Sequence, residues 1–301
     1  MQRCKEERTV ERAFVTLDGI RLHYFVEGRG HPVVCLHGGI LDGRDFRDVL
    51  CLAAARGYRG MAFDRPGYGL SERPNEKMTP FDQARILHRA LQTLEVRQPI
   101  IVGHSWSGLL SLIFAFMYPD SVSGIVLLAP AMYKEGYPAE HGDPLSRLMT
   151  APVIGDLAVR LFLKTPLAGK MTETMLMQTF APETPPDGYR ERVYATFLRP
   201  GQIKANREDV LAFPPAALEA AKRYAEIRHP VFVVVGEEDP FGTKEQALRL
   251  KEDIPHAMLN IVPRVAHMIP QNRPELVIEA IRSIEDATKG DSGRPGEWQT
   301  G

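Results

Sequence analysis

Short apolar segments recur along the chain and alternate with segments whose apolar residues have helical spacing. A helix-like segment covers residues 86–94, and the apolar segments cover 32–38, 58–64, 99–105, 124–130 and 230–240. Strands that are covered on both faces have continuous apolar sequence, and strands that alternate with helices pair in parallel. The pattern therefore predicts an α/β domain with a mostly parallel central sheet flanked by helices.

The N-terminal segment 13–28 has a different pattern, that of two strands joined at Asp18 and Gly19. An Asp-Gly pair supplies the positive φ values that a tight turn between antiparallel strands needs. We therefore expect a β-hairpin here.

Strand-like sequence stops at about residue 131, and residues 131–225 are rich in Pro, Met, Leu and helix formers. Strand-like sequence resumes at Val231 and must still join the sheet, which favours an insertion over an independent second domain. We expect an α/β core of residues 1–130 and 226–286 and a helical cap, or lid, of residues 131–225. Residues 287–301 are polar and glycine-rich without periodicity, which predicts a disordered tail.

Apolar residues in the expected cap have spacings that let helices turn one apolar face toward the core. These residues are Leu148, Ile154, Leu161, Met171, Met175 and Met177.

The composition is that of a soluble globular protein, with 44% hydrophobic residues, 25% charged residues and a formal net charge of −1 over 301 residues. No basic surface for nucleic acid is implied, and no segment is long and apolar enough to suggest a membrane span or a signal peptide. The three cysteines have no metal-ligand spacing, and Cys35 lies in an apolar segment as a buried small hydrophobe would. We expect a cytoplasmic monomer or homodimer.

Residues 100–112 run from a strand-like into a helix-like segment, and Ser105 lies at the turn between them. A serine at this place with small residues two before and two after it forms a nucleophile elbow, because larger side chains would collide in so sharp a turn. Gly103 meets this condition, and Ser107 replaces the second glycine of the pattern. Ser105 is therefore expected to be a nucleophile, with the backbone N–H of Trp106 as an oxyanion donor.

Three further motifs follow other predicted strands. His37, Gly38 and Gly39 follow the strand at 32–36, Asp239 follows a late strand, and His267 lies after the final strand. Serine, acid and histidine occur in this order in α/β-hydrolases. With the loop 64–74 (DRPGYGLSERP) also present, the chain resembles, over about residues 14–284, the capped α/β-hydrolase fold family. That family includes esterases, epoxide hydrolases, haloalkane dehalogenases, proline iminopeptidases and carbon-carbon bond hydrolases.

The resemblance implies a role for several residues. Asp239, the third residue after Gly236, would be the acid that orients His267; relatives that carry the acid after the strand at 124–128 would here need Glu135. Gly39 would supply the second oxyanion amide. Asp64 and Arg65 are interpreted as a structural brace rather than a catalytic pair. The substrate pocket is predicted to include His104, Trp106, Leu148 and Met175.

A serine at position 105 argues against dehalogenation and epoxide opening, which in this family use an aspartate ester as intermediate. We expect a serine hydrolase that cleaves a small to medium uncharged ester, lactone or thioester through an acyl-enzyme, with His267 as base. No metal and no cofactor is expected, since the glycines of 37–43 do not match a dinucleotide fingerprint.

Three alternatives remain open. A proline iminopeptidase-like amidase or peptidase would need cap carboxylates to hold an amino terminus, carbon-carbon bond cleavage uses the same triad, and a receptor-like ligand-binding protein would keep the triad with slow turnover. The available cap carboxylates are Glu173, Glu183, Asp187 and Glu191.

Overall fold

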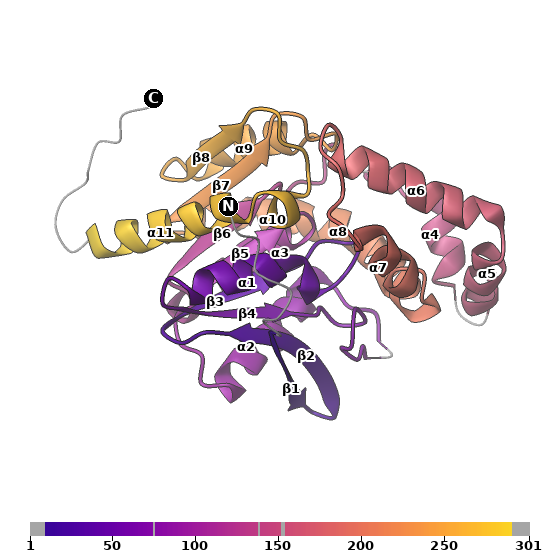
Figure 1. Cartoon of the computed structure of the whole chain (residues 1–301), viewed down its shortest axis with the longest axis horizontal. Coiled ribbons are helices and arrows are strands. Elements are labelled where there is room, and N and C mark those ends of the chain that lie inside the picture. The colour runs from indigo at the N-terminus through magenta and orange to yellow at the C-terminus, as the bar shows by residue number, and fades with distance from the viewer. Residues whose placement is uncertain (1–9, 75, 138, 152–153, 291–301) are drawn as a thin grey trace.

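A central sheet organises the chain, as the alternating apolar segments predict. The structure is a computed structural model that describes residues 10–74, 76–137, 139–151 and 154–290. Within these residues the sheet has eight strands in the order β1-β2-β4-β3-β5-β6-β7-β8 (Figure 1). The strands are β1 Glu11–Leu17, β2 Ile20–Glu27, β3 His31–Leu36, β4 Tyr58–Phe63, β5 Ile100–His104, β6 Gly124–Leu128, β7 Val231–Gly236 and β8 Met258–Val262. The mostly parallel α/β sheet predicted from the sequence is thus confirmed.

The strand directions place the loops that matter for function. β1 pairs antiparallel with β2, and β2 pairs antiparallel with β4, whereas all pairs from β4 to β8 are parallel. The carboxyl ends of the parallel strands therefore lie at one edge of the sheet, where ligands bind in open α/β folds.

The predicted hairpin is confirmed. β1 and β2 pair from Glu11 opposite Val26 to Leu17 opposite Ile20. The two turn residues have positive φ, 48° at Asp18 and 82° at Gly19, as a tight turn with matching twist requires.

Helices cover both faces of the sheet. α1 (Arg47–Ala54), α10 (Ile269–Asn272) and α11 (Pro274–Gly290) pack on one face, and the 3₁₀ helix η1 (Gly43–Phe46) leads into α1. α2 (Pro80–Thr93), α3 (Ser107–Met117), α9 (Thr243–Asp253) and the 3₁₀ helix η3 (Ala221–Glu226) pack on the other face; η2 (Pro119–Ser121) follows α3. Alternate residues of β5 enter the two cores, Ile101 on one side and Val102 on the other.

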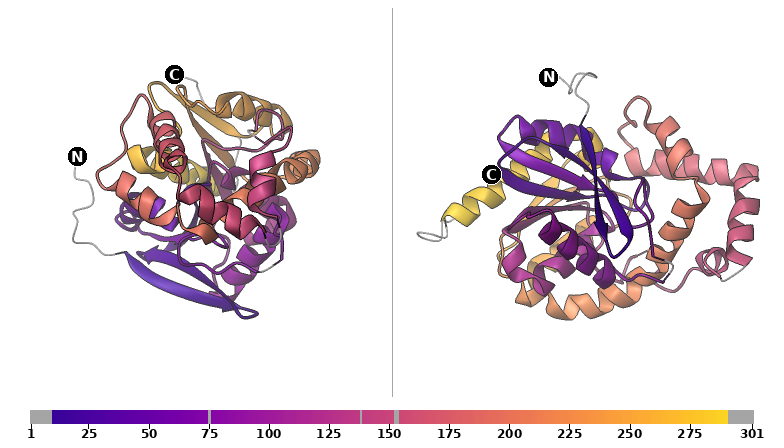
Figure 2. Two further views of the ribbon diagram at one scale, coloured as in Figure 1. Left: turned by 90° about the vertical axis from the view of Figure 1, so that its right-hand side faces the viewer. Right: turned by 90° about the horizontal axis from the view of Figure 1, so that it is seen from below.

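Between β6 and β7 the described residues form five α-helices ahead of η3, and we call these five the inserted helices. They are α4 (Pro144–Met149), α5 (Ile154–Leu163), α6 (Pro166–Phe180), α7 (Tyr189–Thr196) and α8 (Pro200–Ala220). Figures 1 and 2 show α4 to α7 at one side of the sheet. α6 and α7 bury Leu176, Phe180 and Val193 against Leu41 and Met268 of the core. α8 contacts α4 and α5 as well as α2 and α3, so it joins the other inserted helices to the core.

α8 begins earlier than the sequence pattern indicates. In the sequence, a continuous run of apolar residues and helix formers starts only at Phe213. α8 starts at Pro200 and contains Pro214 and Pro215. Its first half buries Gln202, Asn206 and Asp209. Because this inner face is polar, no apolar periodicity marks it.

The predicted tail boundary is wrong for residues 287–290, which belong to α11. The Thr288 hydroxyl donates a hydrogen bond to the Ile284 carbonyl, and Lys289 pairs with Glu285 one turn earlier. These contacts extend the helix into polar sequence. The rest of the predicted tail, 291–301, lies outside the described residues.

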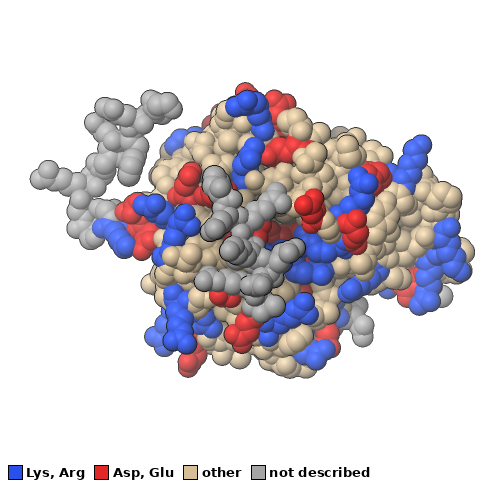
Figure 3. All heavy atoms as spheres, viewed as in Figure 1, with Lys and Arg blue, Asp and Glu red and all other residues tan. Residues whose placement is uncertain are grey.

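Charged side chains of both signs are interspersed on the face drawn in Figure 3, in keeping with the near-neutral net charge. Cys35 is fully buried, as expected for a small hydrophobe. No helix within the described ranges is long and apolar enough to cross a membrane.

One buried carboxyl group makes the stability pH-dependent. Asp45 of η1 is buried, and the nearest cation is the guanidinium of Arg192 at 3.6 Å. Burial, reinforced by the neighbouring Asp42, raises the pKa of Asp45 to about 7, against the attraction of Arg192. Between pH 4 and pH 7 the native state therefore keeps a proton that the unfolded chain has lost, and the free energy of unfolding falls as pH rises.

Asp45→Asn removes this titration. We expect the variant to gain stability relative to wild type by about 1–3 kcal/mol between pH 4 and pH 8, because the native state no longer has to ionise a buried group. Urea denaturation at pH 4, 6 and 8 measures the difference. If wild type instead became more stable than Asp45→Asn as pH rises, the raised pKa of Asp45 would be contradicted.

Candidate active site

Three side chains from three loops meet at the carboxyl edge of the sheet. Ser105 follows β5, Asp239 follows β7 and His267 follows β8. His267 Nε2 lies 2.8 Å from Ser105 Oγ, and its Nδ1 lies 2.7 Å from Asp239 Oδ2. Since a carboxylate only accepts, Nδ1–H donates to Asp239, which leaves Nε2 to accept the serine proton. The structure thus brings together the three residues predicted to be catalytic.

The backbone at Ser105 has the strained conformation of an elbow. Its φ is 53°, although it is not glycine, and its N–H donates to the Leu128 carbonyl at 2.9 Å. The Ser105 carbonyl accepts from Gly108 N–H at 2.8 Å and from Ala131 N–H at 3.0 Å. These bonds hold a conformation that a free chain would leave.

The small residues around Ser105 have separate functions. A Cβ on Gly103 would lie 2.2 Å from Ser111 Oγ and 2.5 Å from the Ser107 carbonyl oxygen. The side chain of Ser107 is fully buried, and its hydroxyl donates a hydrogen bond to the His37 carbonyl at 2.6 Å. The serine that departs from the usual glycine therefore ties the elbow to the loop after β3.

Gly103→Ala is expected to lower the free energy of unfolding by about 1–3 kcal/mol, because the added methyl group has no space in the turn. Guanidinium denaturation measures the change. Gly169→Ala in α6 is the matched control: its Cβ would meet no atom within 4 Å. That substitution is expected to stabilise the protein by about 0.5–1 kcal/mol through helix propensity. A Gly103→Ala variant as stable as wild type would contradict the packing argument.

Asp239 is held as a carboxylate. Its Oδ1 accepts from Phe241 N–H at 2.8 Å, and its Oδ2 accepts from the Thr243 hydroxyl at 2.8 Å as well as from His267. Burial by itself raises the pKa of Asp239, but the charge and hydrogen bond of His267, with the two further hydrogen bonds, lower it below its ordinary value. The carboxylate can therefore stabilise a protonated imidazole.

The alternative acid named from the sequence, Glu135, instead forms an exposed ion pair with Arg249 at 2.8 Å. The two carboxylates next to Asp239 in the chain, Glu237 and Glu238, are exposed.

Two backbone N–H groups lie beside Ser105. Gly39 and Trp106 both line the cavity that contains Ser105 and His267. Among the described residues, neither of their amides donates a backbone-to-backbone hydrogen bond. Gly38 packs so closely that a Cβ there would be 3.1 Å from Ser105 Cβ.

The cavity at Ser105 has a volume of about 210 Å³. A second cavity of about 260 Å³ lies among the inserted helices and shares Met175, Phe197 and Arg207 with it. The first cavity is lined by Gly39, Ile40, Ser105, Trp106, Ala131, Gly136, Tyr137, Met175, Thr179, Phe197, Asn206, Arg207, Val210, Phe241, Thr243, Gln246 and His267.

Of the predicted pocket residues, Trp106 and Met175 line this cavity, whereas His104 and Leu148 do not. His104 is buried beneath the site and its Nε2–H donates to the His267 carbonyl at 3.0 Å. Burial, with His267 nearby, lowers the pKa of His104 to about 3, so its ring is neutral.

The prediction for Leu148 is corrected by the structure, because this side chain is 48% exposed. α4 turns Ser146 and Met149 inward, and Leu148 lies about 100° away around the helix. Four of the other residues that were expected to turn an apolar face toward the core are exposed too: Ile154, Leu161, Met171 and Met177. Met175, which lines the cavity, is the exception.

Two polar lining residues were missed by the sequence analysis. Asn206 and Arg207 lie on the first half of α8 and reach the cavity. Asn206 Nδ2 donates to the Gly39 carbonyl at 2.6 Å, and Arg207 Nε donates to Asn206 Oδ1 at 2.9 Å. The only signal was the polar run from 206 to 209, which by itself resembles a solvated helix face.

Asp64, which was interpreted from the sequence as a structural brace, is buried and bonded to three segments of the core. Its carboxylate accepts from His23 Nδ1 at 2.7 Å, from Gly43 N–H at 2.8 Å and from Leu70 N–H at 2.9 Å. It joins β2, η1 and the loop after β4. Within the described residues, no group of three or more His, Cys, Asp or Glu side chains could hold a metal ion.

Fold and site together define a hydrolase of the α/β class, and comparison with known proteins supports this. The family model for the alpha/beta hydrolase fold matches residues 31–274, and the chain belongs to this family. The "Uncharacterized hydrolase YugF" of Bacillus subtilis is 28% identical over 276 residues, which cover 88% of this chain and 94% of that protein.

Two further comparisons agree. A "2-hydroxy-6-oxononadienedioate/2-hydroxy-6-oxononatrienedioate hydrolase" of Burkholderia vietnamiensis is 28% identical over 293 residues, 92% of this chain and 97% of that protein. An alpha/beta hydrolase fold protein from Burkholderia ambifaria has a crystal structure that superposes with a TM-score of 0.75 at 23% identity. The superposition covers 90% of this chain and 97% of that one, and at this identity it shows the fold.

Proposed function

We propose that the protein is a serine hydrolase that cleaves a small to medium uncharged ester, or the related lactone or thioester, through an acyl-enzyme on Ser105. The observation that carries the proposal is the continuous hydrogen-bond chain from Ser105 Oγ through His267 to Asp239, with distances of 2.8 and 2.7 Å. A serine hydroxyl needs such a base to become nucleophilic.

The geometry supports a defined sequence of steps. His267 Nε2 takes the Ser105 proton as Oγ attacks the carbonyl carbon, and Asp239 stabilises the imidazolium. The N–H groups of Gly39 and Trp106 stabilise the oxyanion. His267 then protonates the leaving alcohol, and in the second half it activates water to release the acid from Ser105.

The nucleophile type argues against two activities found in the family. Halide displacement or epoxide opening by a serine would leave an alkyl ether, which has no carbonyl for water to attack. Hydrolysis of an acyl group is the chemistry that a serine at this position can complete.

We further propose that residues 131–225 act as a cap over a core of 1–130 and 226–286. α8 closes one side of the Ser105 cavity, and Met175 of α6 closes another. A site enclosed in this way accepts a substrate up to a limited size.

The proposed substrate class is tested by varying the length of the acyl chain in an ester substrate. Among p-nitrophenyl esters, kcat/KM is expected to rise up to about fourfold per methylene, since each buried methylene contributes at most about 0.8 kcal/mol. The rise should end between about four and eight carbons, when the acyl chain has filled the space beside Ser105 and the neighbouring cavity that shares lining residues with it. An increase that continued through sixteen carbons would show an open groove instead.

Met175 is placed to set that limit because it lines both cavities. Met175→Trp should shift the optimum to shorter acyl chains. Met177→Trp is the control, since this side chain is 53% exposed two residues further along α6. If both variants had the same dependence of kcat/KM on acyl-chain length, Met175 would not set the limit on substrate size.

Carbon-carbon bond hydrolysis of an oxo acid is the second candidate, and Arg207 favours it. Arg207 lines both cavities, and the carboxylate oxygen nearest its guanidinium, on Asp143, lies 3.8 Å away, beyond hydrogen-bond distance. A cation at that place suits a substrate carboxylate. The Burkholderia vietnamiensis relative is named for hydrolysis of a dienedioate, a dicarboxylate.

Turnover of 2-hydroxy-6-oxononadienedioate faster than of any uncharged ester, with a loss on Arg207→Gln confined to the dioate, would favour the second candidate over the first.

The peptidase and receptor alternatives have less support. None of the four cap carboxylates named for binding an amino terminus lines the Ser105 cavity. Two of them are paired, Glu173 with Arg190 and Glu183 with Arg273. A receptor-like protein would give one burst of acylation and little steady-state turnover, so steady-state kinetics distinguishes it.

A further inference from the structure

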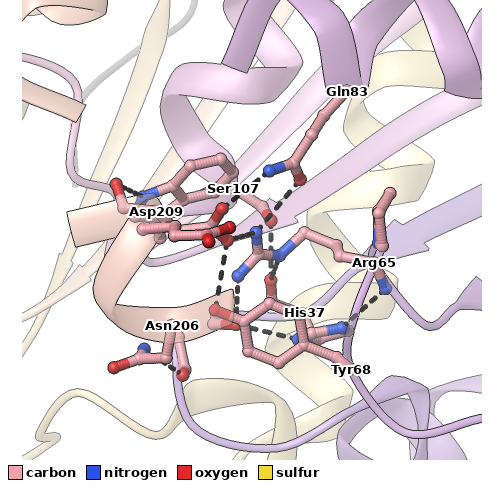
Figure 4. Close-up of polar contacts among 12 residues, drawn as sticks. His37, Arg65, Tyr68, Gln83, Ser107, Asn206 and Asp209 are labelled. Carbon is pink, nitrogen blue, oxygen red and sulfur yellow. Dashed lines mark hydrogen bonds and ion pairs between the residues drawn. The ribbon is translucent and has the colours of Figure 1, made fainter. Parts of the chain in front are cut away.

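A buried ion pair lies directly behind the active-site loops. Arg65 lies in the loop after β4 and Asp209 lies on α8. The distance from Arg65 Nη1 to Asp209 Oδ2 is 2.5 Å, and each side chain is 1% exposed. Figure 4 shows the guanidinium surrounded by His37, Asp209 and Gln83. Burying two charges is costly, so a role beyond stability is worth seeking for this pair.

Arg65 binds the carbonyl side of the loop after β3. Its Nε donates to the His37 carbonyl at 3.2 Å and its Nη2 to the Gly38 carbonyl at 3.0 Å. Its Nη1 donates to Asp209 and, at 3.1 Å, to Gln83 Oε1. The planar fork of the guanidinium makes these bonds simultaneously, which a lysine could not do.

The Gly38 carbonyl is the other end of the peptide group that carries the Gly39 N–H. Because this group is planar, fixing the carbonyl fixes the direction of the N–H. A charged donor on the oxygen also polarises the N–H, since hydrogen bonds in a chain strengthen one another.

His37 adds a second donor to the same carbonyl. Its Nε2 accepts a hydrogen bond from the backbone N–H of Arg65 at 2.9 Å, so in the neutral ring the proton is on Nδ1. Nδ1–H donates to the Gly38 carbonyl at 2.8 Å. Burial, with the charge of Arg65, lowers the pKa of His37 to about 3, which keeps the ring neutral. The Gly38 carbonyl therefore accepts two hydrogen bonds, as the Ser105 carbonyl behind the Trp106 N–H also does.

Arg65 also contacts Trp106, the other residue whose N–H is proposed to stabilise the oxyanion. Its guanidinium carbon lies 4.1 Å from the centre of the Trp106 ring and 4.4 Å from that of Tyr68. The Trp106 indole N–H donates to the Asp209 backbone carbonyl at 3.3 Å.

Asp209 fixes Arg65 from the inserted helices. Its carboxylate also accepts from the Tyr68 hydroxyl at 3.1 Å, from Gln83 Nε2 at 2.9 Å and from Arg73 Nη2 at 3.0 Å. The residues three and two positions before it, Asn206 and Arg207, line the cavity at Ser105. The pair therefore joins α8 to the loop that presents Gly39.

We infer that Arg65 is a positioning residue for acyl transfer, that it orients and polarises the Gly38–Gly39 peptide toward the oxyanion, and that Asp209 of α8 holds it in place. This inference rests on the proposed function, in which the Gly39 amide stabilises the oxyanion.

Arg65→Lys tests it, because lysine keeps the charge next to Asp209 but loses the fork. We expect kcat for a p-nitrophenyl ester to fall about 10- to 100-fold, with KM changed less than about threefold, because the oxyanion develops only in the transition state. Arg73→Lys is the matched control: Arg73 also pairs with Asp209, but its other bonds go to Glu208 and the Pro66 carbonyl. It should retain kcat within about threefold.

An inhibitor pair separates positioning from a general structural effect. A trifluoromethyl ketone forms a hemiketal with Ser105 whose oxyanion faces the two amides, whereas an amide of the same shape binds as a ground-state analogue. The ketone should lose affinity in Arg65→Lys by the same factor as kcat/KM, and the amide should keep its affinity.

Equal losses for both inhibitors, an unchanged kcat in Arg65→Lys, or an equal loss in Arg73→Lys would overturn the inference. If Arg65→Lys does not fold, the isosteric Asp209→Asn replaces it, with the same split expected and the same overturning results. A wild-type protein that neither hydrolyses esters nor binds the ketone at Ser105 would refute the proposed function instead.

Discussion

Replacement of Ser105 by alanine is expected to lower kcat/KM for the preferred ester by on the order of 10⁴ to 10⁶ fold. The variant keeps the cavity, the two amides and His267, but it has no oxygen from which an acyl-enzyme can form. What remains is slow attack by water on a carbonyl polarised in the site. The fold should be unaffected, because the side chain of Ser105 makes its hydrogen bond only to His267 within the described residues.

Steady-state kinetics with purified protein measures this loss, and circular dichroism verifies the fold. Ser283→Ala on α11 is the control and should retain full activity, because in the part of the chain that the structure describes this hydroxyl bonds only to the Glu279 carbonyl of its own helix. A Ser105→Ala variant that kept more than about one hundredth of the wild-type rate would disprove the nucleophile.

Asp239→Asn is expected to lower kcat by on the order of 10³ to 10⁴ fold. Phe241 N–H donates to Oδ1, so the asparagine must keep its oxygen there and present its NH₂ group to His267 Nδ1. Nδ1 would then accept, and the ring proton would move to Nε2, where it faces Ser105 and prevents proton removal. The loss arises from the wrong tautomer in an almost unchanged geometry.

Glu238→Gln, one residue earlier and exposed, should change kcat less than about twofold. Glu135→Gln tests the alternative position of the acid on the same assay. A larger loss in Glu135→Gln than in Asp239→Asn would show that the wrong carboxylate has been assigned.

Local rules explain what was predictable from the sequence. The hairpin at Asp18 and Gly19 and the elbow at Gly103 and Ser105 are set by steric limits on a few neighbouring residues, and such limits are visible in sequence. The order of strands and loops then places Asp239 and the distant His267 at one edge of the sheet.

Partners far apart in the chain explain what was not predictable. Arg65 meets Asp209 across 144 positions, and nothing near either residue indicates the other. The first half of α8 was missed for the same reason, because its inner face bonds to loops that only the tertiary structure brings close. Leu148 was misplaced since a short helix with apolar residues on two faces does not specify which face is buried.

Ser105 as the activated nucleophile is tested most directly by the site of covalent labelling by a fluorophosphonate, which reacts with a serine only when a base and an oxyanion site activate it. We expect one adduct per chain, located by peptide mass spectrometry on Ser105, absent in Ser105→Ala and formed much more slowly in Asp239→Asn. An adduct on another residue, or no adduct on a preparation that hydrolyses esters, would contradict this role of Ser105.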